Sequence, residues 1–101
     1  MRIERKIDTM ARFKTGNLYQ TRGIAAAIEE SPQLFIEIID AYARYINGDY
    51  GDLCIEDIEA NEEAIKHGYR IFAKYETSVD DIYIITEADR SHTTFLFWYE
   101  Y

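Results

Sequence analysis

Hydrophobic residues follow a helical spacing in the middle of the chain and alternate with polar residues in its C-terminal third. In the segment 31–48, apolar residues recur every three to four positions and charged residues fill the opposite stripe, which predicts an amphipathic helix. Ser31 is a natural N-cap, Pro32 suits the first helical position, and Gly48 supplies a left-handed stop. Because the residue before a proline disfavours helical geometry, a shorter helix predicted over 23–30 must end just before this one.

A further helix is predicted from about Cys54 to Lys66, where acids occupy the first turn and bases the last, as the helix dipole favours. Asp52 is its candidate N-cap and Gly68 its stop. Asn61 falls near the apolar face and is interpreted as an amide that anchors backbone groups, because buried amides usually satisfy such groups.

After Gly68 the period of the pattern changes from helical to strand-like. The segments 69–76, 82–86 and 93–101 are alternating or rich in β-branched and aromatic residues, which predicts three strands joined by short turns. The predicted fold is a two-layer α+β domain, in which a three-stranded antiparallel β-meander in the C-terminal half is covered by two or three N-terminal α-helices. The segment 12–21 alternates loosely and is either a frayed arm or an edge strand.

At 101 residues, of which 48% are hydrophobic, the chain is long enough to bury a core and is expected to form one domain, 1–101. Residues 1–10 are expected to be a flexible basic extension. The single cysteine, Cys54, cannot form an internal disulfide, and no apolar run reaches the roughly 18 residues that span a bilayer. The sequence therefore predicts a cytoplasmic protein without membrane contact.

Charge is distributed unevenly along the chain, whose formal net charge is −8. Residues 1–22 contain six bases and two acids, whereas residues 49–63 contain seven acids and no base. Proteins that bind nucleic acid usually present a basic stripe to the phosphates, so direct nucleic-acid binding is not expected. A protein with a basic surface is the favoured partner.

The run 87–92, which reads Glu-Ala-Asp-Arg-Ser-His, joins two predicted strands. Its carboxylates and imidazole could ligate a metal or act as acid and base, but no established metal-site spacing is present. In the alternative interpretation Asp89 and Ser91 cap backbone N–H groups of the turn. Arg90 would then pair with Glu87 or with an acid of the preceding helix, and this structural role is favoured.

The loop 48–53 adds two carboxylates, Asp49 and Asp52, between two predicted helices. If this loop approached the run 87–92, four carboxylates and one arginine would meet. Such a cluster could form a metal site, a network of salt bridges or an acidic contact surface, and the salt-bridge network is favoured. No metal, cofactor or catalytic residue is assigned.

Cys54 and the tyrosines each allow two interpretations. A thiol at a helix start can be activated by the helix dipole, but Cys54 shares an apolar face with Ile58 and is interpreted as buried. Among nine tyrosines, Tyr50 and those near the C-terminus are not all expected to fit in the core. Exposed aromatic residues beside acids are typical of a protein-binding surface. Pairing of the last strand in a homodimer, or its packing on the helices, is an equal alternative.

The segments GDYGDLCIEDIEANEEAIKHGYRIFAKYE and IYIITEADRSHTT resemble a family of small uncharacterised proteins, described as plasmid-related, that phages, plasmids and conjugative elements carry. The resemblance covers about 13–101 and is specific over 48–94, with Tyr50 where the family has tryptophan. The tail FLFWYEY is more aromatic than the tail of the family. The resemblance implies a mobile element in a host bacterial cell and no established activity. It marks as candidates Asp49, Asp52, Leu53, Asp57, Asn61, Thr86, Glu87, Asp89, Arg90 and Ser91.

These features predict an acidic, non-enzymatic accessory protein that binds and inhibits a nucleic-acid-handling host defence system, of anti-CRISPR or anti-restriction type. Carboxylates three or four residues apart on one helix face stand about 5 to 6 Å apart. This spacing is comparable with that of the phosphates along a nucleic-acid strand. A defence nuclease or effector complex with a basic channel is therefore the expected partner. Two alternatives stay open: a regulatory or maintenance factor of the element, and an enzyme or a binder of metal or small ligands that uses Asp49, Asp52, Glu87, Asp89 and Arg90. The predicted partner-binding residues are Asp49, Tyr50, Asp52, Glu56, Asp57, Glu59, Glu63, Glu87, Asp89 and Arg90.

Overall fold

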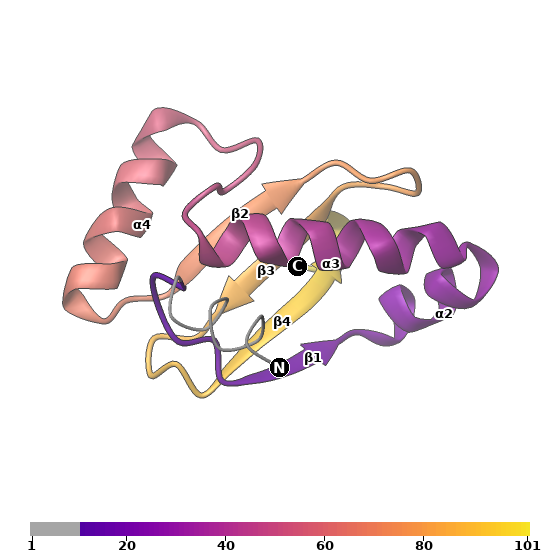
Figure 1. Ribbon diagram of the computed structural model, residues 1–101, viewed down its shortest axis with the longest axis horizontal. Helices are drawn as coiled ribbons and strands as arrows, with labels where there is room; N and C mark the ends of the chain where they lie inside the picture. Colours follow the sequence, from indigo (N-terminus) through magenta and orange to yellow (C-terminus); the bar gives the residue numbers. More distant parts are fainter. Residues whose placement is uncertain (1–10) are drawn as a thin grey trace, which may run out of the picture.

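Four strands form one mixed sheet in the computed structural model, which describes residues 11–101 (Figure 1). The extension predicted for residues 1–10 lies outside the described residues. The predicted meander is present as β2, β3 and β4, whose neighbours run antiparallel. In sheet order the strands are β1 (Asn17–Gln20), β4 (His92–Phe97), β3 (Ile82–Thr86) and β2 (Ile71–Tyr75).

The sheet has four strands, whereas three were predicted. The additional strand is β1, which lies beside β4 and runs parallel to it. Asn17 pairs with His92, and Gln20 pairs with Phe95. Three helices and two other strands separate β1 from β4 along the chain, so no tight turn forces the two strands to run antiparallel. The loose alternation in 12–21 therefore marks an edge strand rather than a frayed arm.

Three helices lie between β1 and β2 in the chain: α2 (Arg22–Glu30), α3 (Pro32–Ile46) and α4 (Ile55–His67). α3 crosses one face of the sheet, and α2 packs beside α3 and β4 (Figure 1). α4 stands at the edge of the sheet, next to β2. The predicted α+β class is confirmed, with one helix at the sheet edge. None of the described helices is long and apolar enough to cross a membrane.

The helix boundaries follow the predicted caps with one exception. Pro32 is the first residue of α3, and Gly68 follows α4 in the left-handed region, at φ 76°. Cys54, and not Asp52, occupies the N-cap position of α4. Asp52 instead donates its backbone N–H to the Lys74 carbonyl at 2.8 Å, so the loop is fixed on the sheet before the helix starts.

Alternate strand residues point toward α3 and form the core with residues from that helix. Tyr45 of α3, Tyr75 of β2 and Phe97 of β4 are its largest fully buried side chains. Burial of a large apolar side chain stabilises a fold by about 1.5–3 kcal/mol. The other core members are Ile24, Leu34, Ile38, Ala41, Ile46, Tyr50, Ala64, Ile71, Ala73, Ile82, Ile84 and Phe95.

A buried chain of hydroxyl groups connects α3, the sheet and the segment before β1. Thr93 Oγ1 donates to the Thr15 carbonyl at 2.8 Å, so the Thr86 hydroxyl must supply the proton for its 2.7 Å contact with Thr93. Tyr45 Oη lies 2.7 Å from Thr86 Oγ1 and is therefore the donor to it, and it also lies 3.2 Å from the Ile71 carbonyl. Burial raises the pKa of Tyr45, which keeps this hydroxyl protonated.

The C-terminal residues were expected to extend the last strand, but β4 ends at Phe97 and is followed by a 3-10 turn, η1 (Trp98–Glu100). The Glu100 carboxylate holds the turn, because it accepts hydrogen bonds from the Phe97 N–H and the Thr21 hydroxyl, both at 2.8 Å. The three aromatic residues after Phe97 are exposed, as expected.

Replacing Thr93 by valine tests the buried hydroxyl chain. The new methyl group keeps the side-chain volume, but it leaves the Thr86 hydroxyl without an acceptor and the Thr15 carbonyl without a donor. We expect the free energy of unfolding, measured by urea denaturation, to fall by about 1–3 kcal/mol. Thr94→Val is the control, because the side chain of Thr94 points to the other face of the sheet. An equal loss in both variants would contradict the role of the chain.

Candidate functional site

One side-chain amide holds α4 against the edge of β2. Asn61 is buried, with 4% of its surface exposed. Its Nδ2 donates to the Phe72 carbonyl at 2.7 Å, and its Oδ1 accepts from the Phe72 N–H at 3.1 Å. The amide therefore pairs with Phe72 as a neighbouring strand would, and the prediction that Asn61 anchors backbone groups is confirmed.

The loop before α4 continues this pairing along β2. The Asp52 N–H donates to the Lys74 carbonyl at 2.8 Å, and the Lys74 N–H donates to the Tyr50 carbonyl at 3.3 Å. Gly51 allows this approach, because its φ is 72° and a Cβ at this position would overlap the Lys74 carbonyl. The outward backbone groups of Phe72 and Lys74 are all hydrogen-bonded, so this edge of the sheet is closed.

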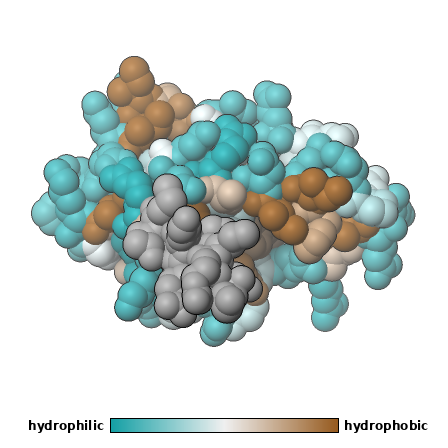
Figure 2. All heavy atoms as spheres, in the orientation of Figure 1, coloured by the Kyte–Doolittle hydropathy of each residue, from teal (hydrophilic) through white to brown (hydrophobic). Residues whose placement is uncertain are grey.

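Because the inner side of α4 is fixed on β2, its outer side faces solvent. Glu56, Glu59 and Glu63 are exposed there, three and four residues apart. Ile55 shares this side and is 70% exposed. Figure 2 shows an apolar area at the start of α4 with hydrophilic residues around it. We define these four residues as the α4 face.

The predicted acidic residues differ in whether the protein neutralises them. Asp49 accepts hydrogen bonds from the Arg44 guanidinium at 2.8 and 3.3 Å, and these bonds lower the pKa of Asp49. Glu63 lies 3.2 Å from His67 and 3.9 Å from Lys66. Within residues 11–101, no base forms an ion pair with Asp52, Glu56, Asp57 or Glu59.

The predictions for Cys54 and Tyr50 are wrong. Cys54 was expected to be buried and is exposed, whereas Tyr50 was assigned to the partner-binding surface and is buried. The Asp57 N–H favours the Cys54 thiolate, but hydrogen bonds to the carboxylates of Asp57 and Glu56 outweigh it and raise the pKa of the thiol. A raised pKa disfavours the thiolate, which is the nucleophilic form of cysteine. The Tyr50 ring packs edge-on against Tyr45, with ring centroids 6.3 Å apart, so it is removed from the predicted partner-binding surface.

Arg90 stabilises the corner 87–91 through carbonyl groups, and not through a carboxylate as predicted. Its guanidinium donates to the carbonyls of Tyr69 at 2.6 Å and Ala64 at 2.9 Å. It also donates to two carbonyls within the corner, both at 3.2 Å. The last turn of a helix leaves carbonyls unpaired and negatively polarised, so a cation is favoured at the end of α4.

The two acids of the corner also have structural partners. Asp89 Oδ1 accepts the Ser91 N–H at 2.9 Å, as predicted, and hydrogen bonding to Ser91 lowers the pKa of Asp89. Glu87 pairs with Arg70 at 3.3 Å, and not with Arg90. The corner is therefore a turn that joins β3 and β4 and caps α4.

The loop 49–52 and the corner 87–91 lie at opposite ends of the meander. The loop contacts Lys74 near the end of β2, whereas the corner follows Thr86, which pairs with Ile71 at the start of β2. The cluster of four carboxylates and one arginine is therefore not formed. The part of the chain that the structure describes contains no group of three or more His, Cys, Asp or Glu side chains that could hold a metal ion.

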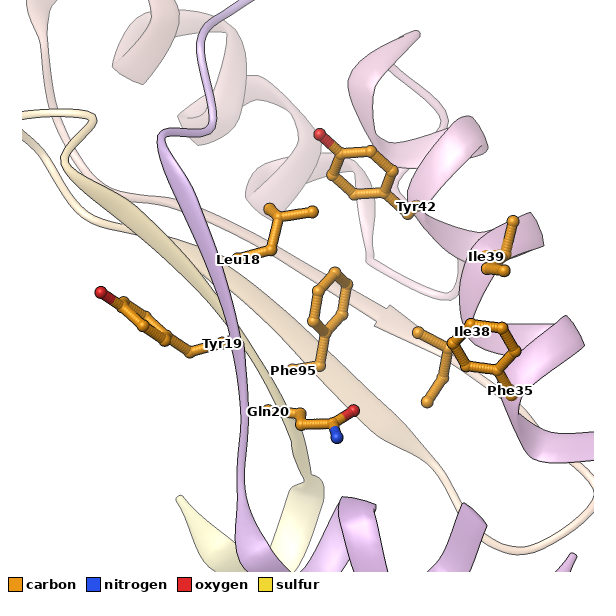
Figure 3. Close-up of a pocket in the computed structure, with 8 residues that line it drawn as sticks. All are labelled: Leu18, Tyr19, Gln20, Phe35, Ile38, Ile39, Tyr42 and Phe95. Carbon is orange, nitrogen blue, oxygen red and sulfur yellow. The ribbon is translucent and has the colours of Figure 1, made fainter. Parts of the chain in front are cut away.

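A groove that sequence reasoning missed lies between α3 and β1, with a volume of about 430 Å³ (Figure 3). The apolar period of α3 includes Phe35 and Ile39, which suggests that both are core residues. They are 49% and 53% exposed, because β1 is the last strand of the sheet on this side. The lining includes Leu18, Tyr19, Gln20, Phe35, Ile39 and Tyr42.

Comparison of the chain with protein-family models, with curated proteins and with solved structures finds no match. The resemblance to a plasmid-related family stays a prediction from the two quoted segments. The α4 face and the groove are the two candidate interaction sites within residues 11–101.

Replacing Asn61 by alanine tests the anchoring of α4. The change leaves the N–H and carbonyl of Phe72 without protein partners, so we expect the free energy of unfolding to fall by about 1–3 kcal/mol in urea denaturation. Glu59→Ala, on the outer side of the same helix, is the control and should change stability by less than about 0.5 kcal/mol. Equal effects would show that Asn61 does not anchor the helix.

The Glu62–Arg12 pair predicts a pH dependence of stability. Arg12 donates to both carboxylate oxygens at 2.7 Å, and these hydrogen bonds lower the pKa of Glu62. A carboxyl with a depressed folded pKa stabilises the protein above its unfolded pKa, and this contribution is lost as pH falls through the folded pKa. Glu62→Gln should therefore lower the melting temperature at about pH 7, and the difference should shrink toward about pH 3. A constant difference would contradict the assignment.

Proposed function

We propose that this chain is an acidic, non-enzymatic accessory protein of a mobile element that binds and inhibits a nucleic-acid-handling defence system of its bacterial host. The observation that carries the proposal is the α4 face. Its carboxylates project into solvent, and Glu56 and Glu59 have no ion-pair partner among the described residues. Glu63 lies near Lys66 and His67, so Glu56 and Glu59 are the uncompensated carboxylates of this face, and they favour a cationic partner surface.

The spacing of these carboxylates supports a nucleic-acid-binding protein as the target. Carboxylates three or four residues apart on a helix stand about 5 to 6 Å apart, which is close to the separation of neighbouring phosphates along a nucleic-acid strand. Enzymes of anti-phage defence hold nucleic acid in basic channels, where phosphate contacts supply most of the affinity. A rigid helix that presents the same charge spacing can compete for such a channel.

Ile55 adds an apolar anchor to this surface. It is 70% exposed at the start of α4, beside Glu56 and Glu59, and Asp52 and Asp57 are exposed nearby. Binding energy in protein interfaces concentrates in a few desolvated apolar side chains surrounded by polar groups. The arrangement therefore supports a protein partner more than a small ligand.

A charge-reversal variant tests the proposal. Glu56→Lys, Glu59→Lys and Glu63→Lys together invert the α4 face and should weaken binding to the target by at least about tenfold. The assay is binding of the wild type and the variant to a panel of purified defence nucleases and effector complexes at about 50 and about 300 mM salt. Wild-type binding should weaken at the higher salt concentration, because it depends on charge.

The control carries the same change of net charge elsewhere. Glu29, Glu30 and Glu76 are exposed and lie outside α4, so their replacement by lysine should leave binding close to that of the wild type. Equal losses in both triple variants, or binding that salt does not weaken, would contradict the proposed surface. If no complex in the panel binds the wild type, defence inhibition is wrong.

A further inference from the structure

The two edges of the sheet differ in how their backbone groups are satisfied. On β2 the outward groups of Phe72 and Lys74 are bonded to Asn61 and to the loop before α4. On β1 no described residue forms hydrogen bonds with the outward backbone groups. The Asn17 N–H donates to the Ser91 carbonyl at 3.1 Å, so the odd-numbered residues of β1 point their backbone groups toward β4.

Leu18 and Gln20 therefore direct their N–H and carbonyl groups outward, away from the sheet. Natural edge strands are usually very short, or they carry a proline, an inward-pointing charge or a bulge that prevents pairing with another chain. β1 has only four residues, so its length limits outward pairing to Leu18 and Gln20. The β1 sequence, Asn-Leu-Tyr-Gln, has no proline and no charge. All four residues are exposed, so the edge is open to a further strand.

The groove beside this edge continues the open surface. Leu18 and Gln20 point toward α3, whereas Tyr19 points away from it (Figure 3). Leu18 is 48% exposed, and Phe35 and Ile39 on the opposite wall are about half exposed. Among the described residues 11–101, no charged side chain lines the groove. An apolar patch next to unpaired strand groups is typical of an interface.

The distribution of charge favours a second copy of the chain as the occupant of this surface. Two copies of a protein with a net charge of −8 repel each other, so self-association is favoured through a patch that contains no acids. The groove and β1 form such a neutral patch. The α4 face, with its row of carboxylates, would repel a second copy.

We propose that a second copy of this chain pairs with β1 in antiparallel orientation, about a two-fold axis at Tyr19. In this register Leu18 lies opposite the partner's Gln20, and their outward backbone groups form four hydrogen bonds across the axis. The two sheets become one eight-stranded sheet. The two grooves meet above it, so the exposed apolar side chains of both α3 helices are covered. The dimer does not use α4, and it is independent of the proposed function.

The oligomeric state tests this interface. Light scattering after size exclusion of the full chain should give about twice the chain mass of 11.9 kDa. Leu18→Lys places a charge in the interface and should halve the measured mass. Ile55→Lys makes the same change at an exposed site on α4 and should leave the dimer intact. Added salt should strengthen the dimer, because it screens the repulsion between the two acidic copies.

Disulfide trapping tests the register and does not depend on the folding of the Leu18→Lys variant. All variants carry Cys54→Ser. Tyr19→Cys should form an interchain disulfide, because residues opposite each other at a non-hydrogen-bonded position have Cα atoms about 4.5 Å apart. Asn17→Cys should form no interchain disulfide, because the two substituted residues of the dimer would be offset by about 14 Å along the paired strands. A monomer at every concentration, a dimer that survives Leu18→Lys, or trapping through Asn17→Cys and not through Tyr19→Cys would overturn the proposal.

Discussion

The pairing of the Asn61 amide with the Phe72 backbone determines where α4 stands, and most other features depend on that position. A strand edge exposes donors and acceptors that must be satisfied. Because the side chain of one helical residue supplies both groups, α4 lies along the edge of β2 rather than over a face of the sheet. Only the inner side of the helix is used, and its acidic outer side remains in water.

The same constraint makes the sheet asymmetric. One edge is closed by α4 and its loop, whereas the other is the short, uncharged β1 beside an apolar groove. Carboxylates are concentrated at the closed edge, in the segment 49–63, and none of the described residues that line the groove carries one. The acidic outer side of α4 and the uncharged groove beside β1 are therefore separate surfaces at opposite edges of the sheet.

Features that depend on neighbouring residues in the sequence, such as helix ends and the exposed side of a helix, were predicted correctly. Pro32 and Gly68 marked helix boundaries because each restricts or permits a specific backbone geometry. Asn61 was recognised as an anchor because a polar side chain on an apolar helix face needs a partner. The exposed glutamates of α4 followed from the helical period, which separates the two sides of the helix.

Contacts between distant segments could not be predicted in this way. β1 is four residues long and pairs with a strand more than seventy residues later, so its pattern is too short to fix its orientation. Arg90 was expected to find a carboxylate, but the carbonyls at the end of α4 lie in its reach only in the folded chain. Tyr50 is buried because the loop is fixed to Lys74, which no local pattern shows.

Amide hydrogen exchange of the wild-type protein tests most directly whether α4 and its loop close the edge of β2. The N–H groups of Phe72 and Lys74 point out of the sheet, and their only described acceptors are the Asn61 side chain and the Tyr50 carbonyl. The account predicts that both exchange as slowly as the Ile84 N–H in the central strand β3. Exchange of Phe72 and Lys74 at the rate of an unprotected edge strand would contradict it.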